Sequence, residues 1–218
     1  AKLALVIRQA TDALNAYEHS KALEVIESFF WQFCDDYIEL VKNRAYGTAD
    51  AHGKVPSDAA VKSARTTLGL GLDAFARLLA PYLPFATEEV WSWMHTGEGS
   101  VHRAAWPKAD IYAAAATGAS PETLAWAGKA VEQLRKIKSE AKVSMKTPIL
   151  SVTLAAVKDG IDAIKSALDD VAQAGRVIGK FDLAEKHAEE AAAEGEGDDT
   201  VVIDASELGE PPAKKAKK

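Results

Sequence analysis

The chain has 218 residues, of which 48% are hydrophobic and 27% charged, proportions that exclude wholesale disorder and collagen-like repetition. Its apolar runs are shorter than the roughly 18 residues that a membrane-spanning helix needs. The single cysteine, Cys34, excludes an internal disulfide framework and is typical of a cytoplasmic protein. Because the chain begins in helical rhythm without a signal peptide, we expect a piece of a longer polypeptide.

The net charge of −6 is unevenly distributed. Residues 1–181 contain 21 basic and 21 acidic residues, whereas residues 182–210 contain 11 acidic residues and one Lys. The last eight residues add four Lys. The acidic character therefore belongs to the tail, and the neutral body is free to bind nucleic acid.

Apolar residues recur at three- and four-residue steps through most of the first 141 residues, which predicts amphipathic helices. The predicted helices cover residues 2–17, 21–45, 58–80, 87–94 and 120–141. Between the last two, residues 96–119 are expected to form an irregular connection.

Polar residues and prolines mark the expected helix boundaries. Ser20 and Ser57 are suited to cap the second and third helices, because a serine hydroxyl can accept a hydrogen bond from a free backbone N–H. Pro81 and Pro84 should end the third helix, since proline cannot continue the hydrogen-bond ladder. Thr87, followed by two glutamates, should begin the next one.

The second and third predicted helices carry broad apolar faces. Phe29, Phe30, Phe33 and Tyr37 are expected in the core, while Trp31 lies on another stripe and suits either core packing or stacking on a nucleic-acid base. The core side of the third helix is expected to include Val61, Ala64, Leu68, Leu72, Phe75 and Leu79.

The pattern changes after Pro148. Strands are predicted at residues 149–154 and 177–183, with a helix at 161–174 between them. The expected fold is mainly α, with a helix bundle over residues 1–147, a small α+β module over 148–183, and a disordered, low-complexity acidic tail ending in lysines over 184–218.

No catalytic signature stands out in the sequence. There is no glycine-rich phosphate loop after a predicted strand, and the five histidines lack metal-ligand spacing. We therefore expect no catalytic residue, no metal site and no cofactor site in this chain.

Two basic stretches, residues 42–77 and 129–146, could contact phosphates, although each could equally be an ordinary solvated helix face. Charge and helix position single out Lys62 and Arg65, and Trp31 is added as a stacking candidate. A helical protein-interaction scaffold without any nucleic-acid role remains the alternative.

Four segments in order resemble the anticodon-binding domain of bacterial valyl-tRNA synthetases: Phe29–Lys42, Leu78–Trp91, Ser100–Pro107 and Leu134–Glu140. The second segment is also similar to isoleucyl- and leucyl-tRNA synthetases. The first and third favour the valyl family. The resemblance covers about residues 1–181, whereas the coiled-coil arm of many family members has no counterpart after residue 183.

The resemblance implies an anticodon-binding helix bundle whose partner is the tRNA for valine. Catalytic and editing domains of the same polypeptide would lie outside this chain, and ATP and Mg²⁺ would serve the full-length enzyme, so this chain alone should be inactive. The resemblance also assigns tRNA contacts to Lys42 and Arg44, and to Arg135, Lys136 and Lys138. No membrane association is expected.

Overall fold

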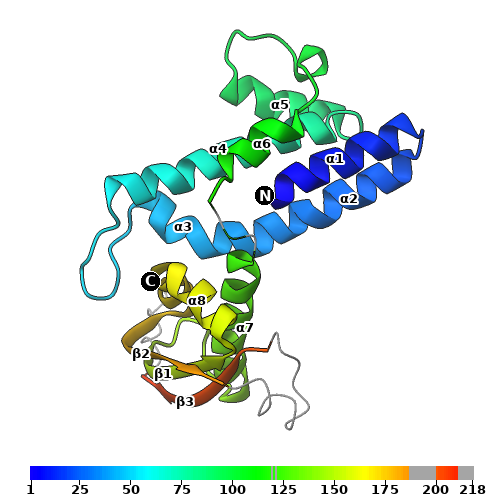
Figure 1. Cartoon of the computed structure of the whole chain (residues 1–218). Coiled ribbons are helices and arrows are strands. Elements are labelled where there is room, and N and C mark those ends of the chain that lie inside the picture. Colours follow the sequence, from blue (N-terminus) through cyan, green and yellow to red (C-terminus); the bar gives the residue numbers. More distant parts are fainter. Residues whose placement is uncertain (119, 121, 187–199, 211–218) are drawn as a thin grey trace. The chain divides into compact units, whose positions relative to one another are not determined.

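A computed structural model describes residues 1–118, 120, 122–186 and 200–210 (Figure 1). The chain forms two compact units. Unit 1 comprises Ala1–Ile38 and Lys62–Pro121, and unit 2 comprises Glu39–Val61 and Glu122–Lys218. Unit 2 thus combines segments from both sides of the predicted boundary at residue 147. No helix in the described part of the chain is long and apolar enough to cross a membrane.

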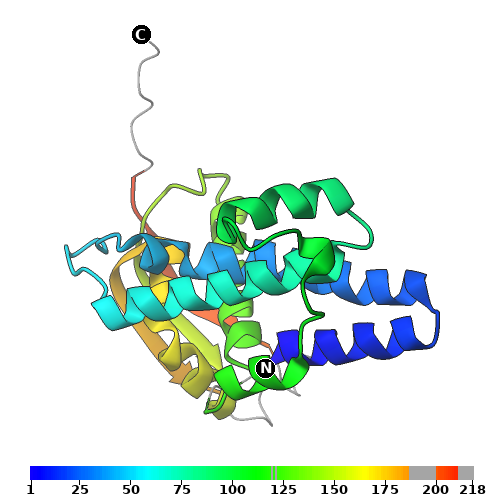
Figure 2. The same cartoon turned by 90° about the horizontal axis from the view of Figure 1, so that it is seen from above.

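Unit 1 is helical. Its elements are α1 (Lys2–Asn15), α2 (His19–Gln32), the π-helix η1 (Phe33–Ile38), α4 (Asp58–Leu79) from Lys62 onward, α5 (Pro84–Met94), the short 3₁₀-helix η2 (Val101–Arg103) and α6 (Ala109–Ala115). Figures 1 and 2 show α1 and α2 running antiparallel, side by side. The tight turn between them follows the short-loop rule for antiparallel helices.

Aromatic rings fill the centre of unit 1. Phe75 of α4 is buried, with the rings of Phe29, Phe30 and Phe33 at 5.9, 5.3 and 5.4 Å between centroids. Gly71 lies one turn earlier on α4, and a Cβ there would stand 2.6 Å from the Phe33 ring. The expectation that these aromatic residues form core is confirmed.

Several predicted details of unit 1 are wrong. Helix α2 starts at His19 and places Ser20 in its first turn, without a side-chain cap at the preceding residue. Helix α5 starts at Pro84 rather than Thr87, because proline suits the first helical position, where no N–H partner is needed. Leu72 is 45% exposed, because Gly71 and Phe75 instead turn toward the core.

Other helix predictions fare differently. Ser57 Oγ accepts a hydrogen bond from the Ala60 N–H at 3.2 Å, which confirms that cap. The supposed irregular connection over 96–119 contains η2 and α6. The π-helix η1 was not predicted; its wider turns follow directly on α2, and apolar spacing does not signal them.

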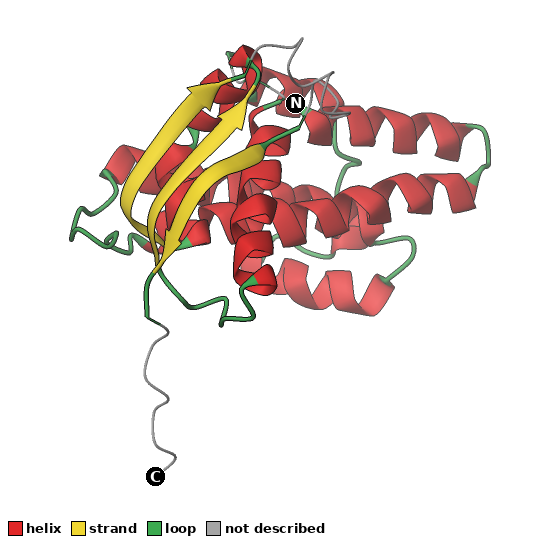
Figure 3. Cartoon of the chain, turned by 90° about the horizontal axis from the view of Figure 1, so that it is seen from below, coloured by secondary structure: helices red, strands yellow, loops and turns green. Residues whose placement is uncertain are grey.

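Unit 2 combines helices with a small sheet. Its elements are α3 (Glu39–Tyr46), α7 (Thr123–Glu140), β1 (Ile149–Ala156), α8 (Lys158–Ser166), α9 (Leu168–Gly175), β2 (Val177–Glu185) and β3 (Val202–Leu208). Figure 3 shows the three strands side by side, in the order β2-β1-β3. Strand β1 pairs parallel with β2, through the α8–α9 crossover, and antiparallel with β3.

The core of unit 2 lies between the sheet and its helices. Ile149, Val152 and Leu154 of β1 are buried together with Ile164 of α8 and Val171 of α9. The predicted helix over 161–174 is two helices, since the chain leaves helical geometry at Ala167. The parallel pairing requires a crossover of this kind, and the sequence pattern predicted a helix between the two strands.

The prediction of a disordered tail from residue 184 is wrong for two segments. Strand β2 continues to Glu185, and residues 202–208 form β3, the second neighbour of β1. Val201 is buried just before β3. The remaining tail residues, 187–199 and 211–218, lie outside the described residues.

Candidate nucleic-acid interface

Three of the eight predicted contact residues lie in unit 1, and all three side chains are exposed. Trp31 is 54% exposed, with its ring edge-on to Phe30 and its Nε1 3.5 Å from the Glu27 carboxylate. Lys62 and Arg65 lie three residues apart near the start of α4. The structure therefore removes Trp31 from the core and leaves it available to a partner.

The basic residues of α7 form the clearest cationic surface of unit 2. Arg135 and Lys136 are exposed, as are Lys142 and Lys146 in the turn that follows the helix. Among the described residues, none of these four side chains has a hydrogen bond or ion pair. We refer to these four residues as the α7 cations. A set of unpaired cations is available to an anionic partner without breaking an existing contact.

Lys138 does not belong to that surface, and its burial counts against the predicted tRNA contact. Its side chain is 2% exposed, and its Nζ donates to the carbonyls of Gly175 at 2.8 Å and Met145 at 3.3 Å. Burial, together with the charge of Arg176, lowers the pKa of Lys138 to about 8. Lys138 instead ties the end of α7 to the following turn and to the end of α9.

Arg44 is likewise committed within the protein. Its Nε lies 3.0 and 3.1 Å from the two oxygens of Asp170, and its Nη2 lies 2.8 Å from one of them. Asp170 is largely buried, and burial raises the pKa of its carboxyl against the opposing effect of Arg44. The guanidinium compensates a buried carboxylate and joins α3 to α9, and the RNA contact of Arg44 stays a prediction.

Lys42 sits close to Arg44 on α3 but in a different setting. Its Nζ pairs with the Glu39 carboxylate one turn earlier, and both side chains are partly exposed. Such a pair contributes little to stability, so Lys42 can exchange Glu39 for another anion.

Residues 48–54 form a loop after α3 that is ordered by its own hydrogen bonds. The Asp50 carboxylate accepts hydrogen bonds from the backbone N–H groups of His52 at 2.8 Å and Lys54 at 2.9 Å, and these bonds lower its pKa. Gly53 adopts φ +79°, a left-handed conformation that favours glycine. Lys54 then forms an exposed ion pair with Asp169 of α9 at 2.9 Å, which brings the loop next to that helix.

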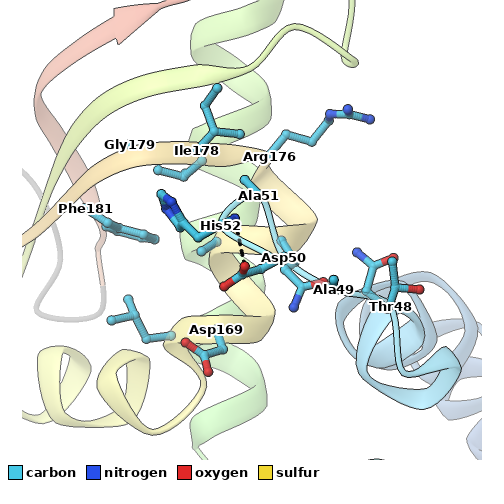
Figure 4. Close-up of a pocket in the computed structure, with 15 residues that line it drawn as sticks. Thr48, Ala49, Asp50, Ala51, His52, Asp169, Arg176, Ile178, Gly179 and Phe181 are labelled. Atoms are coloured by element: carbon cyan, nitrogen blue, oxygen red, sulfur yellow. Dashed lines mark hydrogen bonds between the residues drawn. The ribbon is translucent and has the colours of Figure 1, made fainter. Parts of the chain in front are cut away.

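A groove of about 470 Å³ lies between this loop, α9 and β2 (Figure 4). Its lining includes residues 48–52 of the loop, Gln173 of α9, and Ile178 and Phe181 of β2. Figure 4 shows the His52 ring extending toward β2, on the side where Phe181 and Ile178 lie. The volume falls within the range of small-molecule sites.

The groove is lined by polar side chains that form no hydrogen bond with other described residues. Asn43, His52, Gln173 and Arg176 all line it, and within the described part of the chain no hydrogen bond engages their side-chain groups. Two amides, an imidazole and a guanidinium supply both donors and acceptors. The groove can therefore bind a ligand that has polar edges.

Sequence reasoning missed this groove. The Asp-Ala-His-Gly order at residues 50–53 does signal a turn, because Asp and Gly favour such backbone geometry. Nothing in that signal places the turn against α9 or β2, which lie more than a hundred residues away in sequence. The groove depends on tertiary contacts between Lys54 and Asp169 and between Arg44 and Asp170.

The described residues were also compared with the side-chain groupings that hold metal ions or activate a thiol. No three His, Cys, Asp or Glu side chains among them are arranged to hold a metal ion. Burial raises the pKa of the Cys34 thiol, which keeps it in the unreactive protonated form.

Comparison with known proteins gives a consistent result. A family model described as the anticodon-binding domain of tRNA ligase matches residues 1–154. The chain is 79% identical over 217 residues to the valine–tRNA ligase of Bifidobacterium longum (strain NCC 2705). It is 42% identical over 212 residues to that of Cutibacterium acnes (strain DSM 16379 / KPA171202), and 45% identical over 179 residues to that of Thermobifida fusca (strain YX).

Each match covers most of this chain but only a small part of the relative. They cover 100%, 97% and 81% of this chain, but only 24%, 22% and 19% of the respective relatives. The chain therefore spans about a quarter or less of the length of the valine–tRNA ligases that it matches.

Proposed function

Because the chain belongs to the family of anticodon-binding domains of tRNA ligases, we propose that it binds the tRNA for valine as part of a valine–tRNA ligase. In this role it holds the anticodon arm while another part of the enzyme attaches valine. The observation that carries the proposal is the set of α7 cations, which are exposed and unpaired in the described structure.

The physical basis is electrostatic. Lysine and arginine side chains that contact phosphates release condensed counterions, and this release drives RNA binding at low salt. Arg135 and Lys136 lie on the outer side of α7, and Lys142 and Lys146 extend the positive surface past its end. Lys42, Lys62, Arg65 and Trp31 remain predicted contacts, since each is exposed or only weakly engaged.

Salt dependence tests the proposal. The affinity of the 218-residue chain for the tRNA should fall steeply as salt rises, and Arg135→Ala or Lys136→Ala should each reduce the slope of log affinity against log salt by about one. Lys165→Ala serves as a matched control, because Lys165 is an exposed lysine of unit 2 that pairs with Asp162. If the wild-type chain shows no affinity at low salt, the proposal is wrong.

Anticodon changes test the identity of the tRNA. We expect the tRNA for valine to bind more tightly than the same tRNA with an altered anticodon, because base contacts specify while phosphate contacts only position. Equal affinity would contradict anticodon reading. Preference for the anticodon of isoleucine or leucine would instead assign the chain to a neighbouring synthetase.

Catalysis, editing, and the binding of ATP and Mg²⁺ are assigned in this proposal to other parts of the longer enzyme. The glycines of α4 lie inside a helix, whereas a phosphate-binding loop places its glycines before a helix N-terminus. A role in translation would place the enzyme in the cytoplasm.

A further inference from the structure

We propose that the groove between residues 48–54, α9 and β2 binds one unpaired nucleobase of the RNA. This inference rests on the proposed function and adds to it a specific pocket in unit 2. It assigns the polar contacts to side chains that are not among the eight predicted tRNA contacts: His52, Gln173, Asn43 and Arg176.

The hydrogen-bonding groups of the groove match the edge of a base. A nucleobase presents donors and acceptors side by side, and side-chain amides and guanidinium groups pair with such edges through two bonds at once. Asn43 and Gln173 each carry both kinds of group, and they have no other partner in the described part of the chain. A purely apolar ligand would leave these amides unsatisfied.

The walls of the groove suit a flat ring. His52 and Phe181 both line it, and Figure 4 shows them on the same side of the loop. Neither ring contacts another aromatic ring among the described residues, in contrast with the packed rings around Phe75. Unpaired bases stack on aromatic faces of this kind, which every base can do regardless of its identity.

The charges of the groove disfavour a free anion as its ligand. Lys54 and Asp169 form an ion pair at its rim, and the lining contains both the carboxylate of Asp50 and the guanidinium of Arg176. A neutral base with polar edges fits this balance better than a phosphate ion does. Arg176 can then contact the phosphate or sugar attached to that base.

The groove is held in place before any ligand arrives. The carboxylates of Asp169 and Asp170, at the start of α9, pair with Lys54 and Arg44. The largely buried Arg44–Asp170 pair anchors the start of the segment 44–54, and the exposed Lys54–Asp169 pair lies at its end. At the other end of α9, Lys138 joins Gly175 to Met145 and thus connects the groove to the turn that carries Lys142 and Lys146. Binding to a preformed pocket next to a cationic surface costs less conformational entropy, because the pocket need not be ordered by the ligand.

Two variants test the groove without disturbing its frame. His52→Ala and Gln173→Ala remove side-chain groups that have no partner in the described structure, so both proteins should keep the wild-type melting temperature. Each should weaken binding of the tRNA for valine about tenfold, with an unchanged salt slope, because a lost base contact releases no counterion. His19→Ala, which removes an exposed ring in unit 1, should bind as the wild type does.

The RNA side of the contact is tested with tRNAs that carry one abasic site at a time. One such replacement should weaken binding to the wild type and have no further effect on His52→Ala, which identifies the base that occupies the groove. A separate experiment titrates the protein with nucleoside monophosphates and monitors the NMR chemical shifts of the groove residues. Saturable binding of a monophosphate together with wild-type tRNA affinity of both variants would assign the groove to a free nucleotide and overturn the inference.

Failure of the inference differs from failure of the proposed function. If His52→Ala and Gln173→Ala bind tRNA like the wild type while Arg135→Ala weakens it, the groove inference is wrong and the tRNA-binding function stands. If the wild type itself lacks salt-dependent affinity for tRNA, the proposed function is wrong, and the inference falls with it.

Discussion

The two units use charged side chains in different ways. In unit 1, Asp73 of α4 is the centre of an internal network: it pairs with Arg77, accepts a hydrogen bond from the Tyr112 hydroxyl at 3.0 Å, and lies 3.2 Å from the His95 ring. Burial, with Asp73 nearby, raises the pKa of Tyr112 to about 12. In unit 2, Arg44 and Lys138 are committed to largely buried internal contacts, whereas the α7 cations have no partner among the described residues.

The difference shows that the role of a cation depends on the acids and carbonyls that surround it in the fold. Lys136 and Lys138 are two residues apart on α7, yet one is exposed and the other buried against carbonyl groups. Successive residues of a helix are separated by about 100° around its axis, so a short basic run always points in several directions. The four predictions below set internal contacts against exposed cations.

The largest effect is expected at Arg44. Arg44→Ala leaves the largely buried Asp170 carboxylate without its partner, which should lower the free energy of unfolding by about 3 kcal/mol. Urea unfolding followed by circular dichroism measures this change. Lys42→Ala, on the same helix, removes only a partly exposed pair and should cost less than about 1 kcal/mol. Equal losses in the two variants would contradict the structural role of Arg44.

A smaller loss is expected in the network of unit 1. Asp73→Asn removes the charge that Arg77 compensates, and it should lower the free energy of unfolding by about 2 kcal/mol. Asp110→Asn is the matched control, because Asp110 forms an exposed ion pair with Arg8 and should change stability by less than about 0.5 kcal/mol. The salt slope of tRNA binding should stay unchanged in both variants. A reduced slope in Asp73→Asn would link this network to the RNA.

Lys138 should make stability depend on pH in the alkaline range. Its pKa is lowered from 10.5 to about 8 in the folded protein, so between these values the unfolded chain binds more protons. The free energy of unfolding should therefore rise by roughly 1 kcal/mol between pH 7 and pH 9. Below pH 7 Lys138 is charged in both states, so the full destabilising effect of the buried charge is present there. Lys138→Met should lack this rise. An identical pH profile in both proteins would show that Lys138 keeps an ordinary pKa.

The sequence predicts the helical elements of this protein well wherever one apolar face repeats regularly. The aromatic face of α2 and the cap at Ser57 depend on neighbours within a few residues, and both are present as expected. The small sheet was predicted in part, because residues 149–154 and 177–183 are rich in Val, Ile, Leu and Phe. Strand β3 was missed because it follows an acidic segment, and its pairing with β1 adds contacts that local composition does not indicate.

The candidate site was less predictable than the fold. Charge alone does not separate Arg135 from Lys138, because the separation depends on carbonyls contributed by Met145 and Gly175. The groove residues His52 and Gln173 were not singled out either, since they meet only after α9 and the loop are joined by two ion pairs. Such long-range pairings arise from the fold, and a single sequence carries no local signal for them.

The smallest change in stability is expected at Lys136. Lys136→Ala removes an exposed side chain that has no partner in the described structure, so the free energy of unfolding should change by less than about 0.5 kcal/mol. The same variant should nevertheless reduce the salt slope of tRNA binding, which separates it from Arg44→Ala, where stability changes most. A loss of more than about 1 kcal/mol, measured by urea unfolding, would mean that Lys136 supports the fold, and the division between internal and exposed cations of unit 2 would then have to be redrawn.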